Sequence, residues 1–168
     1  MDYKQHIREV IDFPKPGINF KDITTLIQKP EVFRACVDEL ALLIQDADVI
    51  IGLDARGFLF AGALAYKLNK PLAVVRKAGK LPYKTISIDY ELEYGKNTFE
   101  LNIDAVKPGD KVAIIDDLLA TGWTARAACE LVKRLGWEVS SVNCVVNLPF
   151  LFGEEFLKEY TVNCLVRY

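Results

Sequence analysis

The sequence predicts an α/β protein whose central, mostly parallel sheet is flanked by helices. Short apolar runs typical of buried strands alternate along the chain with helical patterns. Two of these runs, at 49–53 and 112–115, are each followed by a polar loop and then a helix. Strands that alternate with helices in this way form parallel sheets with helices on both faces. With 168 residues, the chain 1–168 is expected to form a single domain.

Composition and charge exclude several classes of protein. The formal net charge of −2 gives no electrostatic reason to expect nucleic acid or a membrane surface as a partner. The N-terminus lacks the apolar core of a signal peptide, and no apolar run is long enough to span a bilayer. The expected location is therefore cytoplasmic.

The cysteines and the single histidine carry no obvious chemistry. Cys36 and Cys129 fall in helical patterns, whereas Cys144 and Cys164 fall in strand-like runs. Because none is paired at metal-ligand spacing, buried free thiols are favoured over zinc ligands or disulfides. His6 lies in a polar segment, so we expect a surface residue rather than a catalytic base.

The N-terminal third is expected to be helical on either side of a rigid turn. An amphipathic helix is predicted over Tyr3–Ile11. Two prolines and a glycine in residues 13–24 predict a fixed, non-helical segment. A second helix is predicted over Glu31–Gln45, and Pro30 suits its first turn.

A first strand–loop–helix unit follows. The strand Val49–Leu53 leads into the loop Asp54–Gly57 and a helix over Phe58–Leu68. The loop carries Arg56 beside the free N–H groups of a helix start, an arrangement that suits a polyanion. A surface arginine paired with a nearby acid is the alternative.

The middle of the chain is basic and strand-like. A strand at Leu72–Val75 ends in Arg76 and Lys77, and a loop with further lysines follows. The segments Ile86–Leu92 and Asn97–Leu101 are expected to pair as an antiparallel hairpin. Such an insertion is typical of a lid that excludes water from a site, although an edge hairpin without that role is the alternative.

The most informative stretch runs from Val112 to Thr124. A buried strand is expected to end at two adjacent acids, and a short turn then leads into a helix; the polar residues are Asp116, Asp117, Thr121, Gly122 and Thr124. A helix start with hydroxyls and a glycine can bind a phosphate group, while the carboxylates can accept hydrogen bonds from sugar hydroxyls. Each half alone would suit a solvated loop or an N-cap, but together they favour a sugar-phosphate site.

The C-terminal third returns to the alternating pattern. A helix is predicted over Ala125–Leu135 and is expected to stop at Gly136. A strand over Val139–Val146, a short helix over Phe152–Glu159 and a strand over Val162–Val166 complete the chain.

Five blocks of this sequence resemble the adenine phosphoribosyltransferase family. The 112–124 stretch resembles the phosphoribosyl pyrophosphate motif of type I phosphoribosyltransferases, and the other blocks are Phe13–Ile23, Gly52–Phe60, Arg76–Pro82 and Tyr90–Gly95. The resemblance covers nearly the whole chain. It implies the type I phosphoribosyltransferase fold, with residues 1–30 as an N-terminal hood segment and residues 76–101 as a lid loop and flexible antiparallel hairpin.

The resemblance implies an activity, a cofactor and an assembly. Members transfer the 5-phosphoribosyl group from phosphoribosyl pyrophosphate to adenine, giving AMP and pyrophosphate. Mg²⁺ is expected to arrive with phosphoribosyl pyrophosphate rather than on direct protein ligands, with Asp116 or Asp117 reaching it through water. The partners implied are adenine, phosphoribosyl pyrophosphate and a second copy of the chain in a homodimer.

The resemblance also assigns residues. The ribose hydroxyls are assigned to Asp116 and Asp117, and the 5′-phosphate to Ala120, Thr121, Gly122, Trp123 and Thr124. The pyrophosphate is assigned to Ala55, Arg56, Arg76, Lys77 and Lys80. Adenine is assigned to Ile18, Asn19, Phe20 and Lys21. Glu93 is expected to handle the proton on the attacking purine nitrogen, and Tyr94 to help close the hood. With Arg56, Asp116 and Asp117, Glu93 forms the expected catalytic set. Nearby cations and the metal are expected to keep the acids ionised.

Three positions depart from the family pattern, and two other functions stay open. Trp123 and Ala61 each stand where relatives usually have glycine, and Lys21 stands where many have arginine. Transfer to a 6-oxopurine is one alternative, because purine choice depends on a few pocket contacts. A non-catalytic regulator that binds phosphoribosyl pyrophosphate is the other.

Overall fold

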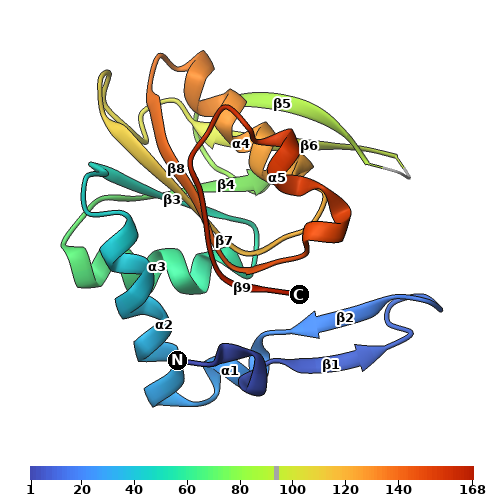
Figure 1. The fold of residues 1–168 in the computed structure, drawn as a ribbon. Coiled ribbons are helices and arrows are strands. Elements are labelled where there is room, and N and C mark those ends of the chain that lie inside the picture. Colours follow the sequence, from blue (N-terminus) through green and yellow to red (C-terminus); the bar gives the residue numbers. More distant parts are fainter. Residues whose placement is uncertain (93–94) are drawn as a thin grey trace.

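The computed structural model describes residues 1–92 and 95–168. Its main feature is a seven-stranded sheet with helices on both faces, joined by a separate two-stranded hairpin near the N-terminus (Figure 1). The predicted α/β fold with a mostly parallel central sheet is confirmed.

The large sheet has a parallel part and an antiparallel part. Its strands, in spatial order, are β5 (Thr85–Leu92), β6 (Gly95–Asn102), β4 (Leu72–Lys77), β3 (Val49–Leu53), β7 (Lys111–Leu119), β8 (Glu138–Asn147) and β9 (Val162–Arg167). Strands β4, β3, β7, β8 and β9 pair in parallel, while β6 pairs antiparallel with both β4 and β5. The predicted hairpin at 86–101 is therefore confirmed as an extension of the β4 edge.

The helices cover both faces of this sheet. They are α1 (Thr24–Ile27), α2 (Pro30–Leu43), α3 (Gly57–Leu68), α4 (Trp123–Arg134) and α5 (Gly153–Phe156), with 3₁₀ turns η1 (Tyr3–His6) and η2 (Pro149–Leu151). No helix among the residues described is long and apolar enough to cross a membrane.

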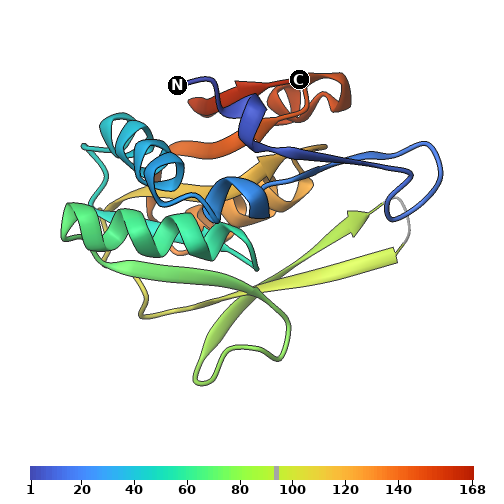
Figure 2. The same cartoon turned by 90° about the horizontal axis from the view of Figure 1, so that it is seen from below.

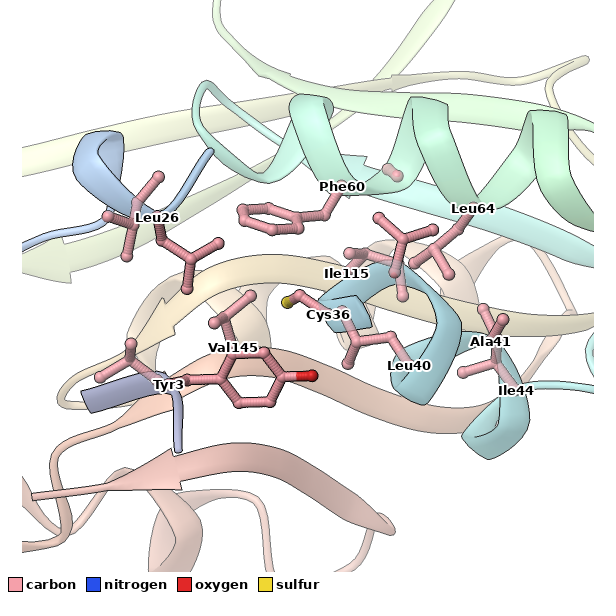
Figure 3. Close-up of a cluster of buried hydrophobic side chains, with 14 of the residues drawn as sticks. Tyr3, Leu26, Cys36, Leu40, Ala41, Ile44, Phe60, Leu64, Ile115 and Val145 are labelled. Carbon is pink, nitrogen blue, oxygen red and sulfur yellow. The ribbon is translucent and has the colours of Figure 1, made fainter. Parts of the chain in front are cut away.

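Side-chain alternation along the strands produces two cores, one on each face. Ala113 and Ile115 of β7 face α2 and α3, and this core also receives Tyr3 and Phe60 (Figure 3). Val112 and Ile114 face the opposite way, toward α4 and the β5–β6 hairpin. Consecutive residues of β7 therefore point to opposite faces, and this matters for the two acids that follow.

The predicted helix over Tyr3–Ile11 is wrong beyond its first turn. Only η1 is helical, whereas Arg8–Ile11 forms strand β1, which pairs antiparallel with β2 (Asn19–Asp22). The local apolar spacing suits a helix, but pairing with partners 8 to 14 residues away decides the outcome. The resulting hairpin extends from the main body toward the side where β9 ends (Figures 1 and 2).

Elsewhere most predicted elements are confirmed, with two changes of length. Strand β3 has the predicted bounds, and α2, α3 and β9 differ from theirs by one or two residues. The helix expected over 152–159 is only the four-residue α5. Strand β7 continues to Leu119, past the acids expected to terminate it, because its pairing with β8 persists to that residue.

All four cysteines are free, as predicted. Cys36, Cys129 and Cys144 are buried, whereas Cys164 is partly exposed. The sulfur atoms of Cys144 and Cys164, on neighbouring strands β8 and β9, lie 2.6 Å apart.

Candidate active site

Asp116 and Asp117 lie where β7 loses one of its two neighbours. Pairing with β3 ends at Ile115, while pairing with β8 continues. By alternation, Asp116 points toward the α4 face and Asp117 toward the α2–α3 face. Asp117 is 5% exposed, and its backbone N–H donates to Asp116 Oδ1 at 2.8 Å. The two acids are therefore held in a crevice beyond the end of β3, which is where open α/β sheets bind ligands.

Arg56 brings a cation to the same crevice from the start of α3. Its Nη2 lies 2.8 Å from Asp117 Oδ2, an ion pair without the alignment of a hydrogen bond. This close approach depends on Gly57, because a Cβ there would lie 2.8 Å from the Ile115 carbonyl oxygen. The structure thus joins the two predicted loops, 54–57 and 116–124, as one site.

Burial dominates the electrostatics of the acid pair. It raises the pKa of Asp116, and the negative charge of Asp117 raises it further. The pKa of Asp117 is also raised by burial, although the positive charge of Arg56 opposes this. Desolvation therefore outweighs the positive charge of Arg56 at this crevice, and the pKa of both acids is shifted upward.

The predicted phosphate turn adopts a left-handed conformation at its glycine. Gly122 has φ +85° and precedes the first residue of α4, Trp123, so the helix begins two residues before the predicted Ala125. Gly122 also packs closely, because a Cβ there would lie 2.8 Å from the Gly153 carbonyl oxygen. Ala120, Thr121 and Thr124 complete the turn.

A small cavity connects this turn to Asp116. It measures about 70 Å³, and its lining includes Asp116, Ala120, Thr121, Gly122 and Thr124. Asp116 and the hydroxyl-bearing residues of the turn therefore face a common space, next to the N–H groups at the start of α4.

A larger cavity of about 720 Å³ lies between the N-terminal hairpin and the C-terminal part of the chain. It is lined by Gly17, Ile18, Asn19, Lys21, Thr121, Trp123, Leu148, Phe150, Leu151 and Tyr168. Thr121 lines both cavities, which makes the larger one continuous with the phosphate turn. Sequence reasoning found the hairpin wall of this cavity but missed the opposite wall.

The missed wall consists of Leu148 and its neighbours after β8, together with Tyr168 after β9. These residues belong to no recognisable motif. The only signal was that apolar residues continue beyond the ends of two predicted strands, at 148–152 and at 168.

Phe20 is placed differently from its neighbours in the hairpin. It is not among the residues that line the larger cavity. Its ring lies 5.2 Å from that of Phe13 and 5.1 Å from the guanidinium carbon of Arg56. Phe20 therefore borders the crevice of the acids and Arg56.

Of the predicted pyrophosphate residues, Ala55 and Arg56 belong to the loop after β3, and Arg76 contacts that loop. Arg76 Nε lies 3.3 Å from Asp54 Oδ2, and Arg76 Nη1 donates to the Lys80 carbonyl oxygen at 3.3 Å. Lys77 and Lys80 are exposed. Ala55 joins Asp54 through a cis peptide bond and directly precedes Arg56. Glu93 and Tyr94, the predicted proton handler and hood residue, lie outside the described residues.

The carboxylate oxygens of the site suit a hard cation such as Mg²⁺ that arrives bound to a phosphate-bearing substrate. Mg²⁺ prefers carboxylate and phosphate oxygens and retains several waters. Among the residues described, no group of three or more histidine, cysteine or acidic side chains could hold a metal ion. Asp116 and Asp117 offer carboxylate oxygens, so further ligands would have to come from substrate and water.

Comparison with known proteins identifies a family for this arrangement. The model of the phosphoribosyl transferase domain matches residues 23–164. An adenine phosphoribosyltransferase from Acetivibrio thermocellus is 50% identical over 171 aligned positions, and the match covers all of both chains. One from Caldicellulosiruptor bescii is 51% identical and covers all of this chain and 97% of its own.

Solved structures agree with these matches. The adenine phosphoribosyltransferase of Thermoanaerobacter pseudethanolicus has a TM-score of 0.95 at 44% identity, covering 99% of this chain and 98% of its own. The enzyme from Saccharomyces cerevisiae, solved with an imino-altritol bisphosphate and adenine, has a TM-score of 0.93 at 37% identity, covering 98% and 96%.

Proposed function

This chain belongs to the adenine phosphoribosyltransferase family, and from that membership we propose how its residues divide the reaction. The reaction is transfer of the 5-phosphoribosyl group from phosphoribosyl pyrophosphate to adenine, giving AMP and pyrophosphate. One observation carries the assignment of roles: Thr121 lines both the small cavity beside the acids and the large cavity under the hairpin. A nucleotide needs this arrangement, with a phosphate site and a base site on either side of the ribose.

The ribose 5-phosphate half is assigned to the end of β7 and the start of α4. Asp116 and Asp117 accept hydrogen bonds from the 2′- and 3′-hydroxyls. The backbone N–H groups and hydroxyls of Ala120–Thr124 bind the 5′-phosphate, because a helix start provides unpaired donors and a favourable dipole. The positive φ of Gly122 and its tight packing support a fixed turn at this position.

The pyrophosphate half is assigned to the loop after β3 and to the lid. Arg56 and the backbone at Ala55 bind the leaving group, assisted by Arg76, Lys77 and Lys80. Breaking the bond at the anomeric carbon leaves positive charge on the ribose and negative charge on pyrophosphate. Fixed cations stabilise the leaving group, and the two carboxylates favour the cationic sugar.

Adenine is assigned to the large cavity. Ile18, Asn19 and Lys21 line it, while Phe20 lies beside Arg56 at the crevice of the two acids. Adenine is expected to be recognised mainly through backbone groups of residues 18–21. Glu93 is proposed to accept the proton of the attacking nitrogen and Tyr94 to close the hood, both on the basis of sequence alone.

Mg²⁺ is proposed as the cofactor, held between substrate oxygens and, through water, Asp116 or Asp117. When bound it neutralises charge on the pyrophosphate leaving group. A homodimer located in the cytoplasm is the proposed form of the protein, supported by family membership. Light scattering of the purified chain would test the dimer.

The activity is tested by mixing the protein with Mg²⁺, phosphoribosyl pyrophosphate and one base at a time. AMP formed from adenine is the expected product. Formation of IMP or GMP without AMP would indicate a 6-oxopurine enzyme, and binding of phosphoribosyl pyrophosphate without any product would indicate a regulator.

A further inference from the structure

The side chain of Lys21 is directed away from solvent and into a contact with the last residue of the chain. Lys21 is 6% exposed, and its ammonium nitrogen lies 4.1 Å from the centroid of the Tyr168 ring. The same nitrogen lies 3.0 Å from Glu9 Oε2 on the neighbouring strand β1. A buried ammonium group is costly unless it is paired, so these two contacts fix where this side chain rests.

The contact joins two parts of the chain that are otherwise separate walls of one cavity. Lys21 belongs to β2 of the hairpin, and Tyr168 follows β9 of the large sheet. Tyr168 is itself fixed, because its N–H donates to the Asn147 carbonyl oxygen at the end of β8. A second cation from the N-terminal segment, Lys4, lies 5.0 Å from the same ring.

We propose that Tyr168 is a positioning residue for the base site, which sets the position of the hairpin wall through the ammonium group of Lys21. The ring face holds the cation, the cation holds β2, and β2 presents Ile18 and Asn19 to the cavity. This inference rests on the proposed function, because it takes the 720 Å³ cavity as the adenine site.

The ring face, and not the hydroxyl, carries this role. The Tyr168 hydroxyl oxygen is buried and has no hydrogen-bond partner within the part of the chain that the structure describes. Phenylalanine would keep the attraction between cation and ring, whereas leucine would remove it while filling much of the same volume. The two substitutions therefore form a matched pair.

The test measures binding of AMP and of ribose 5-phosphate by calorimetry. Tyr168→Leu is expected to lower the affinity for AMP by about 5- to 30-fold, which is the range for a partly desolvated cation–π contact. The affinity for ribose 5-phosphate is expected to stay unchanged. Tyr168→Phe is expected to match the wild type for both ligands. Tyr66→Leu, at an exposed tyrosine of α3, is the control for loss of an aromatic ring.

Substitutions at Lys21 provide a second, independent test of the proposal. Lys21→Met should weaken AMP selectively as Tyr168→Leu does, and Lys21→Arg should restore the affinity. The double variant with Lys21→Met and Tyr168→Leu should bind AMP about as well as Lys21→Met alone, because the contact between ammonium group and ring is already lost in that single variant. If the two effects add, each side chain touches the base directly, and the proposal is wrong.

Other outcomes also decide the matter. Equal loss of AMP and ribose 5-phosphate in Tyr168→Leu, or a Tyr168→Phe variant as weak as Tyr168→Leu, would overturn the positioning role. The proposed function fails separately, if the wild-type protein binds neither ligand. Should Tyr168→Leu not fold, the Lys21→Met and Lys21→Arg pair still gives the answer.

Discussion

Arg56 Nη2 lies 2.8 Å from Asp117 Oδ2, so the cation proposed for pyrophosphate and an acid proposed for ribose are paired with each other. In the proposed complex, the pyrophosphate of phosphoribosyl pyrophosphate binds Arg56 and a ribose hydroxyl binds Asp117. The substrate must therefore compete with the ion pair between these two side chains. The pair holds the start of α3 against β7, and its position explains why two loops far apart in the sequence act as one site.

Replacing Asp117 by asparagine tests the role of this acid. Asp117→Asn removes the charge of the proposed acceptor for a ribose hydroxyl, and hydrogen bonds to charged groups contribute ~1.5–3 kcal/mol. We expect kcat/KM for phosphoribosyl pyrophosphate to fall by about 10- to 100-fold, with the circular dichroism spectrum unchanged. Asp104→Asn, at an exposed acid after β6, is the control. Unchanged kinetics in Asp117→Asn would remove the assigned role.

Replacing Asp116 tests the cost of burying an acid at the site. Because the pKa of Asp116 is raised in the folded state, the folded protein binds more protons than the unfolded chain above about pH 4. Stability is therefore lost as the pH rises from the ordinary pKa through the raised one. Asp116→Asn should have a higher Tm than the wild type at pH 7, and the difference should vanish near pH 4. Asparagine can still accept the Asp117 N–H, which limits other losses.

The result for Asp116 also has a functional side. The same variant should lose activity, because it removes an acceptor for a ribose hydroxyl. A variant that is both more stable and less active would show that the charge of Asp116 destabilises the fold but is needed for the reaction. A lower Tm than the wild type at pH 7 would mean that the charge of Asp116 stabilises the folded protein.

Two glycines of α3 form a matched test of close packing. Gly57→Ala places a Cβ 2.8 Å from the Ile115 carbonyl oxygen, so α3 must move away from β7. We expect a loss of ~1–3 kcal/mol in the free energy of unfolding and a higher KM for phosphoribosyl pyrophosphate. Gly62→Ala meets nothing within 4 Å and should stabilise the helix by ~0.5–1 kcal/mol. Equal effects of the two changes in urea unfolding would contradict this.

Trp123 tests the departure from the usual glycine in the phosphate turn. Its ring centroid lies 4.2 Å from that of Phe156, and aromatic pairs of this kind contribute ~0.5–1.5 kcal/mol beyond their buried area. Trp123→Gly should lower the free energy of unfolding by at least this amount. It should change the affinity for ribose 5-phosphate by less than about threefold, because the donors of the turn are backbone groups and hydroxyls. A large loss of phosphate affinity would mean that the indole shapes the turn.

The sequence predicted helices and strands well where the local apolar pattern favours the same structure as the pairing with distant segments of the chain. Strand β3 is apolar throughout and bounded by polar residues, so its limits could be read directly. Residues 8–11 have helical spacing, but pairing with 19–22 overrides it. The end of β7 was misplaced because two adjacent acids look like the end of a strand. Pairing with β8 continues through them, and a single strand's sequence does not reveal its neighbour.

For the site, motifs predicted the residues that line the small cavity, but not the second wall of the large cavity. Thr121 and Asp116 lie in one contiguous block with a recognisable order. Leu148 and Tyr168 reach the cavity only because β8 and β9 end beside it. Residues that contribute shape rather than chemistry carry no motif.

The division between the two cavities has a consequence for how such an enzyme can change. The walls of the large cavity are formed mainly by the N-terminal hairpin and by the segments after β8 and β9, with Thr121 and Trp123 at their border, whereas Asp116 and Asp117 belong to strand β7 of the sheet. Under the proposed assignment, mutations in the hairpin or after β8 and β9 are expected to change which nucleobase is accepted while leaving the two acids of β7 in place. Exchange of the opening two dozen residues between relatives would be a practical route to altered substrate range.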